Sequence, residues 1–151
     1  MFRRLVWMLL CAAVVGCGDE GSGPTAPDES PEVPETPEVL GRWVGESLTV
    51  VVTADGRWTS DGVLIGEAVC GGSTGELRLR MQLGGVVELG PPARISATTT
   101  TGTITELRKS ITASWDLDWK QLRGTAAGSS RTPNGCSGFV THEFVLTRAG
   151  E

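Results

Sequence analysis

Tyrosine is absent from this chain of 151 residues, histidine occurs once, and aromatic residues make up only 5% of the sequence. No C-x-x-C pair is present, so the cysteines and the single histidine do not predict a zinc or redox site. No G-x-S-x-G or comparable arrangement places a nucleophile beside a base. These absences predict a protein that is not an enzyme and that holds no metal and no cofactor.

A cluster of positive charge is also missing. The chain has 18 acidic and 13 basic residues, but seven of the acids lie between residues 18 and 39, and Arg3 and Arg4 lie at the start. The remaining 112 residues, 40–151, therefore hold 11 acids and 11 bases. Because binding to phosphates requires grouped lysine and arginine, we expect no nucleic-acid partner for this part of the chain.

The one apolar run is too short to cross a membrane. Residues 5–15 are apolar, they follow Arg3 and Arg4, and the small residue Gly16 closes the run. A helix that spans the roughly 30 Å hydrocarbon layer needs about 20 such residues. A positive start, a short apolar core and a small residue are typical of a secretory signal peptide, which we predict for residues 1–16.

The end of this run suggests a lipid anchor. Val14-Val15-Gly16-Cys17 resembles the lipobox of bacterial lipoproteins. The resemblance implies that Cys17 carries a thioether-linked diacylglycerol with further acylation, such as palmitate, and becomes the new N-terminus. Gly18, where an aspartate would imply retention at the inner membrane, favours the outer membrane. The expected location is the cell envelope, on its periplasmic face or the cell surface; the alternative is a plain signal peptide with a chance cysteine.

The segment after the cysteine has the composition of a tether. Residues 18–39 contain five prolines and seven acids and almost no large apolar side chains. Such a composition cannot bury enough surface to offset the entropy of ordering, so we predict that the lipidated N-terminus and linker, residues 17–39, are disordered. Proline-rich, like-charged segments extend by roughly 3 Å per residue, which gives a spacer on the order of 60 Å.

Two cysteines remain for the mature domain. Cys11 leaves with the signal peptide and Cys17 is expected to be acylated, so only Cys70 and Cys136 are left. In an oxidising compartment an even pair in a small domain is most simply a disulfide bond. We therefore predict that Cys70 and Cys136 form a structural disulfide.

Residues 40–151 have the pattern of an all-β domain. Period-2 alternation, β-branched residues and glycine-containing breaks predominate, and Ala54-Asp55-Gly56 is a strong hairpin signal. We expect about eight strands in an antiparallel up-and-down barrel, with a β-sandwich as the alternative. The expected strands, some of which must merge, cover residues 42–53, 56–60, 62–70, 75–83, 86–89, 93–101, 103–107, 110–121, 122–129 and 138–148.

Both ends of this domain suggest a family. Gly41-Arg42-Trp43 opens the first expected strand, and Arg148 lies in the last. This combination resembles the lipocalin and avidin-like barrels, the calycins. The resemblance implies that the tryptophan closes one end of a barrel and that the late arginine packs across its ring, so that Gly41, Trp43 and Arg148 have a structural role.

The segment Trp115-Asp116-Leu117-Asp118-Trp119 is the strongest candidate for a binding site. Strand alternation sends Trp115, Leu117 and Trp119 to one face and both aspartates to the other. Since Ile111 and Ala113 continue the indole face, we expect it to be interior. The tryptophans then either fill the core or line a ligand pocket. Asp116 and Asp118 are expected to be solvated.

His142 shares a strand face with Val140, Phe144 and Leu146, so we expect it to point inward as a core residue or a polar contact in a cavity. Two functional hypotheses follow. In the first, the domain is a lipocalin-like binding module for a small apolar ligand, with Trp115, Trp119 and His142 in its pocket. In the second, the barrel is filled and the domain is a protein-interaction module, a hydrolase inhibitor or an accessory subunit of an envelope complex, acting through glycine-rich loops at 71–75 and 128–135.

Overall fold

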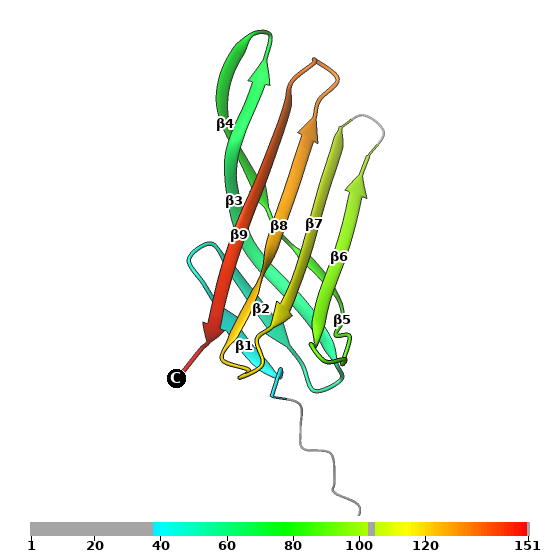
Figure 1. Ribbon diagram of the computed structural model, residues 1–151. Helices are drawn as coiled ribbons and strands as arrows, with labels where there is room; N and C mark the ends of the chain where they lie inside the picture. The colour runs from blue at the N-terminus through cyan, green and yellow to red at the C-terminus, as the bar shows by residue number, and fades with distance from the viewer. Residues whose placement is uncertain (1–37, 103–104, 151) are drawn as a thin grey trace, which may run out of the picture. The chain divides into compact units, whose positions relative to one another are not determined.

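The computed structural model describes residues 38–102 and 105–150 (Figure 1). The predicted signal peptide, Cys17 and the linker up to residue 37 lie outside the described residues. The described residues form strands and no helix, which confirms the all-β prediction. The nine strands are β1 (Gly41–Val44), β2 (Leu48–Val52), β3 (Arg57–Cys70), β4 (Ser73–Arg80), β5 (Leu83–Val86), β6 (Arg94–Thr101), β7 (Glu106–Trp115), β8 (Gln121–Arg131) and β9 (Ser137–Arg148).

All nine strands belong to one antiparallel sheet. The strand order is β4-β3-β2-β1-β9-β8-β7-β6, and β5 pairs with β3. Figure 1 shows β9, β8, β7 and β6 side by side, as this order requires. β5 also lies beside β6, because Glu88 and Arg94 form a bridge in which each backbone N–H donates to the other residue's carbonyl, at 2.8 and 2.9 Å.

Strand β3 organises the sheet because its two halves have different neighbours. Its first half, from Arg57, pairs with β2 on one side and β5 on the other. Its second half, up to Cys70, pairs with β4 on one side and β9 on the other. The hairpin of β1 and β2 is therefore inserted between β3 and β9 over only part of their length.

Several expected strands differ from the observed ones. The sequence predicted one strand over 42–53, but this segment forms the hairpin of β1 and β2. Gly45 starts the turn, and its N–H donates to the Leu48 carbonyl at 3.0 Å. A Cβ atom at Gly45 would lie 2.8 Å from the Val145 carbonyl oxygen, a backbone atom of β9, so glycine permits the close approach to β9 there. Conversely, the predicted strands 56–60 and 62–70 are one continuous strand, β3, and its hairpin with β2 confirms the Asp55-Gly56 turn.

The core is formed mainly by every second side chain along the strands, as strand alternation requires. Its members are Val39, Trp43, Leu48, Val50, Val52, Trp58, Leu64, Leu79, Met81, Leu83, Val87, Ala93, Ile95, Ile111, Ala113, Trp115, Leu122, Ala126, Val140, Phe144 and Leu146. Val39, which the sequence reading assigned to the linker, is only 1% exposed, so the domain begins before the predicted boundary at residue 40.

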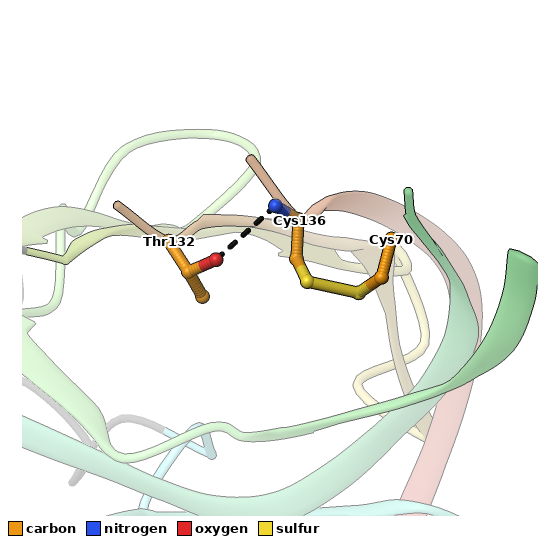
Figure 2. The surroundings of a disulfide bond; sticks show 3 residues. All are labelled: Cys70, Thr132 and Cys136. Carbon is orange, nitrogen blue, oxygen red and sulfur yellow. Dashed lines mark hydrogen bonds between the residues drawn. A yellow bond between two sulfur atoms is a disulfide. The ribbon is translucent and has the colours of Figure 1, made fainter. Parts of the chain in front are cut away.

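The predicted disulfide between Cys70 and Cys136 is confirmed. It joins the end of β3 to the loop between β8 and β9, with the Cα atoms 4.2 Å apart (Figure 2). The backbone N–H of Cys136 donates to Thr132 Oγ1 at 3.2 Å. The bridge thus fastens two connections that lie 66 residues apart in sequence.

Within residues 38–102 and 105–150, no helix is long and apolar enough to cross a membrane.

Candidate ligand-binding cleft

The sheet divides where β9 changes its neighbour. β9 pairs with β3 at Ser137–Phe139 and with β1 at Thr147 and Arg148. Between these two positions, the residues of β9 pair with neither β3 nor β1 on this side, although they remain paired with β8 on the other. The turn at residues 45–47 lies in this gap, because the Val63 N–H of β3 donates to the Ser47 carbonyl at 3.1 Å. Three strand segments therefore diverge at one point of the sheet.

Two glycines of β3 set the edges of this gap. A Cβ atom at Gly62 would lie 2.3 Å from the Ser47 carbonyl oxygen, and one at Gly66 would lie 2.6 Å from Val140 Cβ. Both distances are closer than real Cβ contacts, so β3 approaches the turn at one glycine and β9 at the other only because both side chains are missing. Between the two glycines the strands separate.

A cleft of about 620 Å³ occupies the gap. A cavity of this size is within the range of sites for small molecules. Val63 and Ile65 of β3 supply an apolar wall on the exposed face of the strand, where Ile65 is 58% exposed, whereas Leu64 between them belongs to the core. The remaining lining residues are Glu46, Ser47 and His142.

The polar groups of the cleft are an imidazole, a carboxylate and a hydroxyl. His142 reaches it from β9, and Glu46 and Ser47 reach it from the turn. The Ser47 hydroxyl is buried and has no hydrogen-bond partner among the described residues. A buried polar atom without a partner loses the hydrogen bonds that it would make in water, so this hydroxyl carries an uncompensated cost in the fold. The cleft therefore combines an apolar wall with groups that can orient a polar head.

Trp115, the first predicted pocket residue, is part of the core. Its residue surface is 2% exposed, and its ring lies edge-on to that of Trp43, with the centroids 5.8 Å apart. Its indole N–H has no partner among the described residues. Trp115 lines neither the cleft at His142 nor the groove at Trp119 described below. It fills the interior.

The expectation that Trp115, Leu117 and Trp119 share an interior strand face is wrong. β7 ends at Trp115, and the next residues form a turn in which Asp116 Oδ1 accepts the backbone N–H groups of Lys120 at 2.9 Å and Gln121 at 3.2 Å. Leu117 is 90% exposed. Trp119 has a φ of 57°, the left-handed conformation, which ends strand alternation. Asp116 therefore shapes a turn, while Asp118 is exposed as expected.

Trp119 is half-buried in a different place from His142. It lines a groove of about 510 Å³ together with Arg148 and other polar residues. The three predicted pocket residues are thus not brought together: Trp115 is in the core, Trp119 lies beside Arg148, and His142 lines the cleft at the sheet division.

Trp43 and Arg148 lie in register on β1 and β9. The Arg148 guanidinium carbon is 5.2 Å from the Trp43 ring centroid, and its Nη2 donates to the Glu38 carbonyl. The Trp43 indole N–H donates to the Val39 carbonyl at 3.0 Å. Gly41 has a φ of 122°, a conformation that L side chains rarely adopt. These contacts fasten the chain entering the domain to its last strand.

Two displaced pKa values belong to exposed groups outside the cleft. A hydrogen bond from the Thr53 hydroxyl is the main cause that lowers the pKa of Asp55, in the turn between β2 and β3. A hydrogen bond to Glu76 raises the pKa of Arg78, on β4. Both shifts accompany surface turns and ion pairs rather than chemistry in a cavity.

Sequence reasoning found His142 but missed the other lining residues. The prediction of one strand over 42–53 includes Glu46 and Ser47, and the prediction of a strand over 62–70 does not single out Val63 or Ile65 as site residues. The signal that was available is Gly45, the fourth residue of a 12-residue run that is too long for a typical strand. The contact with β9 could not be derived from it.

No group of three or more potential metal ligands is present among residues 38–102 and 105–150. No protein-family model, curated protein or solved structure matches this chain.

Proposed function

We propose that this protein is a lipid-anchored protein of the bacterial cell envelope whose β domain binds a small, mainly apolar ligand in the cleft at the sheet division. Cys17 is the attachment point for the membrane, most simply the outer membrane, and the residues from Cys17 to the start of the described domain are the tether. The composition and the lipobox support this assignment. The proposed activity is binding without catalysis, cofactor or nucleic acid.

We also propose that the sheet acts as an eight-stranded barrel. β4 and β5 both run antiparallel to β3 and together make one wall, so the nine strands count as eight. The bridge between Glu88 and Arg94 brings β5 to β6, the end of the strand order. Arg148 over Trp43 supports the calycin-like closure of one barrel end.

The cleft is the observation that carries the proposed binding function. Its volume of about 620 Å³ exceeds that of the groove at Trp119, and its wall is apolar. His142 and Glu46 in the lining favour a ligand whose apolar body ends in a hydrogen-bonding group. Since Trp115 is packed in the core, the ligand site is centred on His142 rather than on the tryptophans.

Titration with the fluorescent apolar amine N-phenyl-1-naphthylamine tests this site in the intact protein. We expect saturable binding at one site per chain. Ile65→Gln makes the apolar wall polar, and His142→Ala removes the imidazole. Each is expected to weaken binding at least tenfold, which corresponds to about 1.4 kcal/mol.

Val86→Gln is the matched control, because Val86 is an exposed apolar residue of β5 that does not line the cleft. It is expected to leave binding of the probe unchanged. Equal binding by wild type, Ile65→Gln and His142→Ala, or no saturable binding at all, would contradict the assignment of the ligand to this cleft.

The alternative function is a protein-interaction module with a filled interior. Apolar side chains exposed on the outside of β3 and β9 favour it, since contiguous apolar surface often marks a partner site. These side chains are Val63, Ile65, Val69, Phe139 and Val145. In this case the protein isolated from its envelope carries a polypeptide rather than a small molecule. Both predicted loops are wrong in part, because β4 already begins at Ser73 within 71–75 and β8 continues to Arg131 within 128–135.

A further inference from the structure

A second set of side chains is gathered on the outer face of β7, β8 and β9 and shares no lining residue with the cleft. Arg108 of β7 lies opposite Ser129 of β8, which lies opposite Phe139 of β9. Residues opposite each other in antiparallel strands point to the same face of the sheet. Their sequence neighbours Gly128 and Val140 are buried, so this row faces away from the core.

The next row toward the disulfide repeats this arrangement. Glu106 lies opposite Arg131, which lies opposite Ser137. Successive residues on one face of a strand are about 6.8 Å apart, and neighbouring strands are about 4.8 Å apart. Arg108, Arg131 and Phe139 therefore border a strip of small hydroxyl side chains. We call the residues of these two rows the outer-face strip: Glu106, Arg108, Ser129, Arg131, Ser137 and Phe139.

The outer-face strip is hollowed. Two depressions of about 360 Å³ each share Arg108 and Ser129 as lining residues; one also includes Arg131 and Ser137, and the other includes Phe139. These depressions form where β8 supplies only small side chains, at Gly128, Ser129 and Ser130. Phe139 is 65% exposed, an unusual position for an aromatic ring.

The outer-face strip holds two arginines and one glutamate, and Glu67 of β3 lies opposite Phe139 at its edge. The Glu106 carboxylate pairs with Arg108, with Nε 2.5 Å from Oε1. Among the described residues, Arg131 takes part in no ion pair. A guanidinium presents donors in a fork that matches a carboxylate, so Arg131 is suited to bind one.

We propose that the outer-face strip binds a polysaccharide that carries carboxylate groups. Phe139 stacks against the apolar face of one sugar ring, the hydroxyls of Ser129 and Ser137 bond to sugar hydroxyls, and Arg131 binds the carboxylate of a neighbouring ring. An open strip across several strands fits an extended chain. This site is separate from the cleft, and it stands whether or not the cleft binds a ligand.

An acidic polypeptide is the less suitable occupant. Its carboxylates would pair with the arginines, but it offers no ring face to stack on Phe139 and no hydroxyls to bond to Ser129 and Ser137. The combination of an aromatic platform, hydroxyls and a guanidinium fits a carboxylated sugar, which has a ring face, hydroxyls and an anion in each unit. The contribution of Phe139 therefore distinguishes the two classes.

Isothermal titration of the intact protein with oligogalacturonate tests the proposal. We expect one binding site per chain, weakened by added salt because the arginine–carboxylate contact is exposed. Phe139→Ala and Arg131→Ala are each expected to reduce the affinity at least tenfold. An uncharged maltooligosaccharide of the same length is expected to bind at least tenfold more weakly than oligogalacturonate.

The same two strands provide matched controls. Arg123 of β8 lies opposite Val145 of β9, and both are exposed, so they repeat the pair of a cation and an apolar side chain outside the strip. Arg123→Ala and Val145→Ala are expected to keep full affinity. Circular dichroism of all four variants verifies that the fold is retained.

Any one of four results would overturn the proposal. The first is no binding of oligogalacturonate at millimolar concentration. The second is equal binding of the uncharged oligosaccharide. The third is binding of oligogalacturonate that Arg123→Ala weakens as much as Arg131→Ala does. The fourth is binding of polyglutamate with the same affinity and with no loss in Phe139→Ala. Each of these two results would show attraction to charge without recognition of a sugar.

Discussion

Arg148 lies over the ring of Trp43, with its guanidinium carbon 5.2 Å from the ring centroid, and the two residues are directly paired on β9 and β1. The same arginine donates to the carbonyl of Glu38, at the entrance to the domain. One side chain thus holds the first strand, the last strand and the incoming chain together.

Replacing Arg148 is therefore expected to destabilise the fold. An interaction of a cation with an aromatic ring is worth about 0.5 to 2 kcal/mol, and a hydrogen bond adds about 1 kcal/mol. Arg148→Ala is expected to lower the free energy of unfolding in urea by about 1 to 3 kcal/mol. Arg123→Ala, at an exposed arginine of β8, serves as control with a change within about 0.5 kcal/mol. Equal effects of the two variants would contradict a structural role for Arg148.

The disulfide is expected to contribute more than any single side-chain contact. It closes a loop between positions 66 residues apart, for which the lost entropy of the unfolded chain corresponds to about 4 kcal/mol. The double variant Cys70→Ala/Cys136→Ala should lose about this amount in urea denaturation. Adding reductant to that variant should have no further effect. A loss below about 1 kcal/mol would mean that the loops hold each other without the bridge.

Gly62 tests the approach of the first hairpin to β3. A Cβ atom there would meet the Ser47 carbonyl oxygen at 2.3 Å and Leu48 Cα at 2.9 Å, both backbone atoms. Gly62→Ala is expected to destabilise the domain by about 1 to 3 kcal/mol in urea denaturation and to disturb the cleft. Gly75→Ala is the control, because Gly75 lies in β4 with no atom within 4 Å of the added carbon. It should be neutral or slightly stabilising; a loss as large as that of Gly62→Ala would exclude crowding as the cause.

Asp55 gives a prediction for pH. Its Oδ1 accepts the Thr53 hydroxyl at 2.5 Å, and this bond lowers the pKa of the carboxyl below its ordinary value of 3.8. A lowered pKa in the folded state means that the ionised carboxylate stabilises the hairpin at all pH values above about 4. That contribution is lost as the pH falls through the lower, folded-state pKa. An NMR titration of the Asp55 carboxyl should give a lowered pKa that Thr53→Ala raises; an unchanged pKa in Thr53→Ala would contradict the cause.

The sequence predicted those features that depend on local chemistry. Period-2 alternation identified the all-β class, Asp55-Gly56 identified a hairpin, and two remaining cysteines identified the disulfide. Each of these inferences needs only neighbouring residues or a count. The strand β9 was predicted to within one residue for the same reason, since its alternation is regular from Val140 to Leu146.

The sequence did not predict features that depend on contacts between distant segments. The close approach of Gly45 to β9, about a hundred residues later, leaves no room for a Cβ atom beside the Val145 carbonyl oxygen. Leu117 is exposed because Asp116 accepts the hydrogen bonds of a turn at this point. The alternation of apolar and acidic residues from Trp115 to Trp119 is the same as that of a strand, so the sequence predicted a strand there. The cleft arises where β9 changes its neighbour from β3 to β1, and the register of three strands is not encoded in any one of them.

Native mass spectrometry of the protein, extracted gently from the envelope of its own host, tests the central claim most directly. The account predicts a reproducible small-molecule adduct at one per chain, lost on unfolding, absent from Ile65→Gln and retained in Val86→Gln. A wild-type domain without any adduct, or with a polypeptide bound in its place, would contradict the binding function proposed for the cleft at His142.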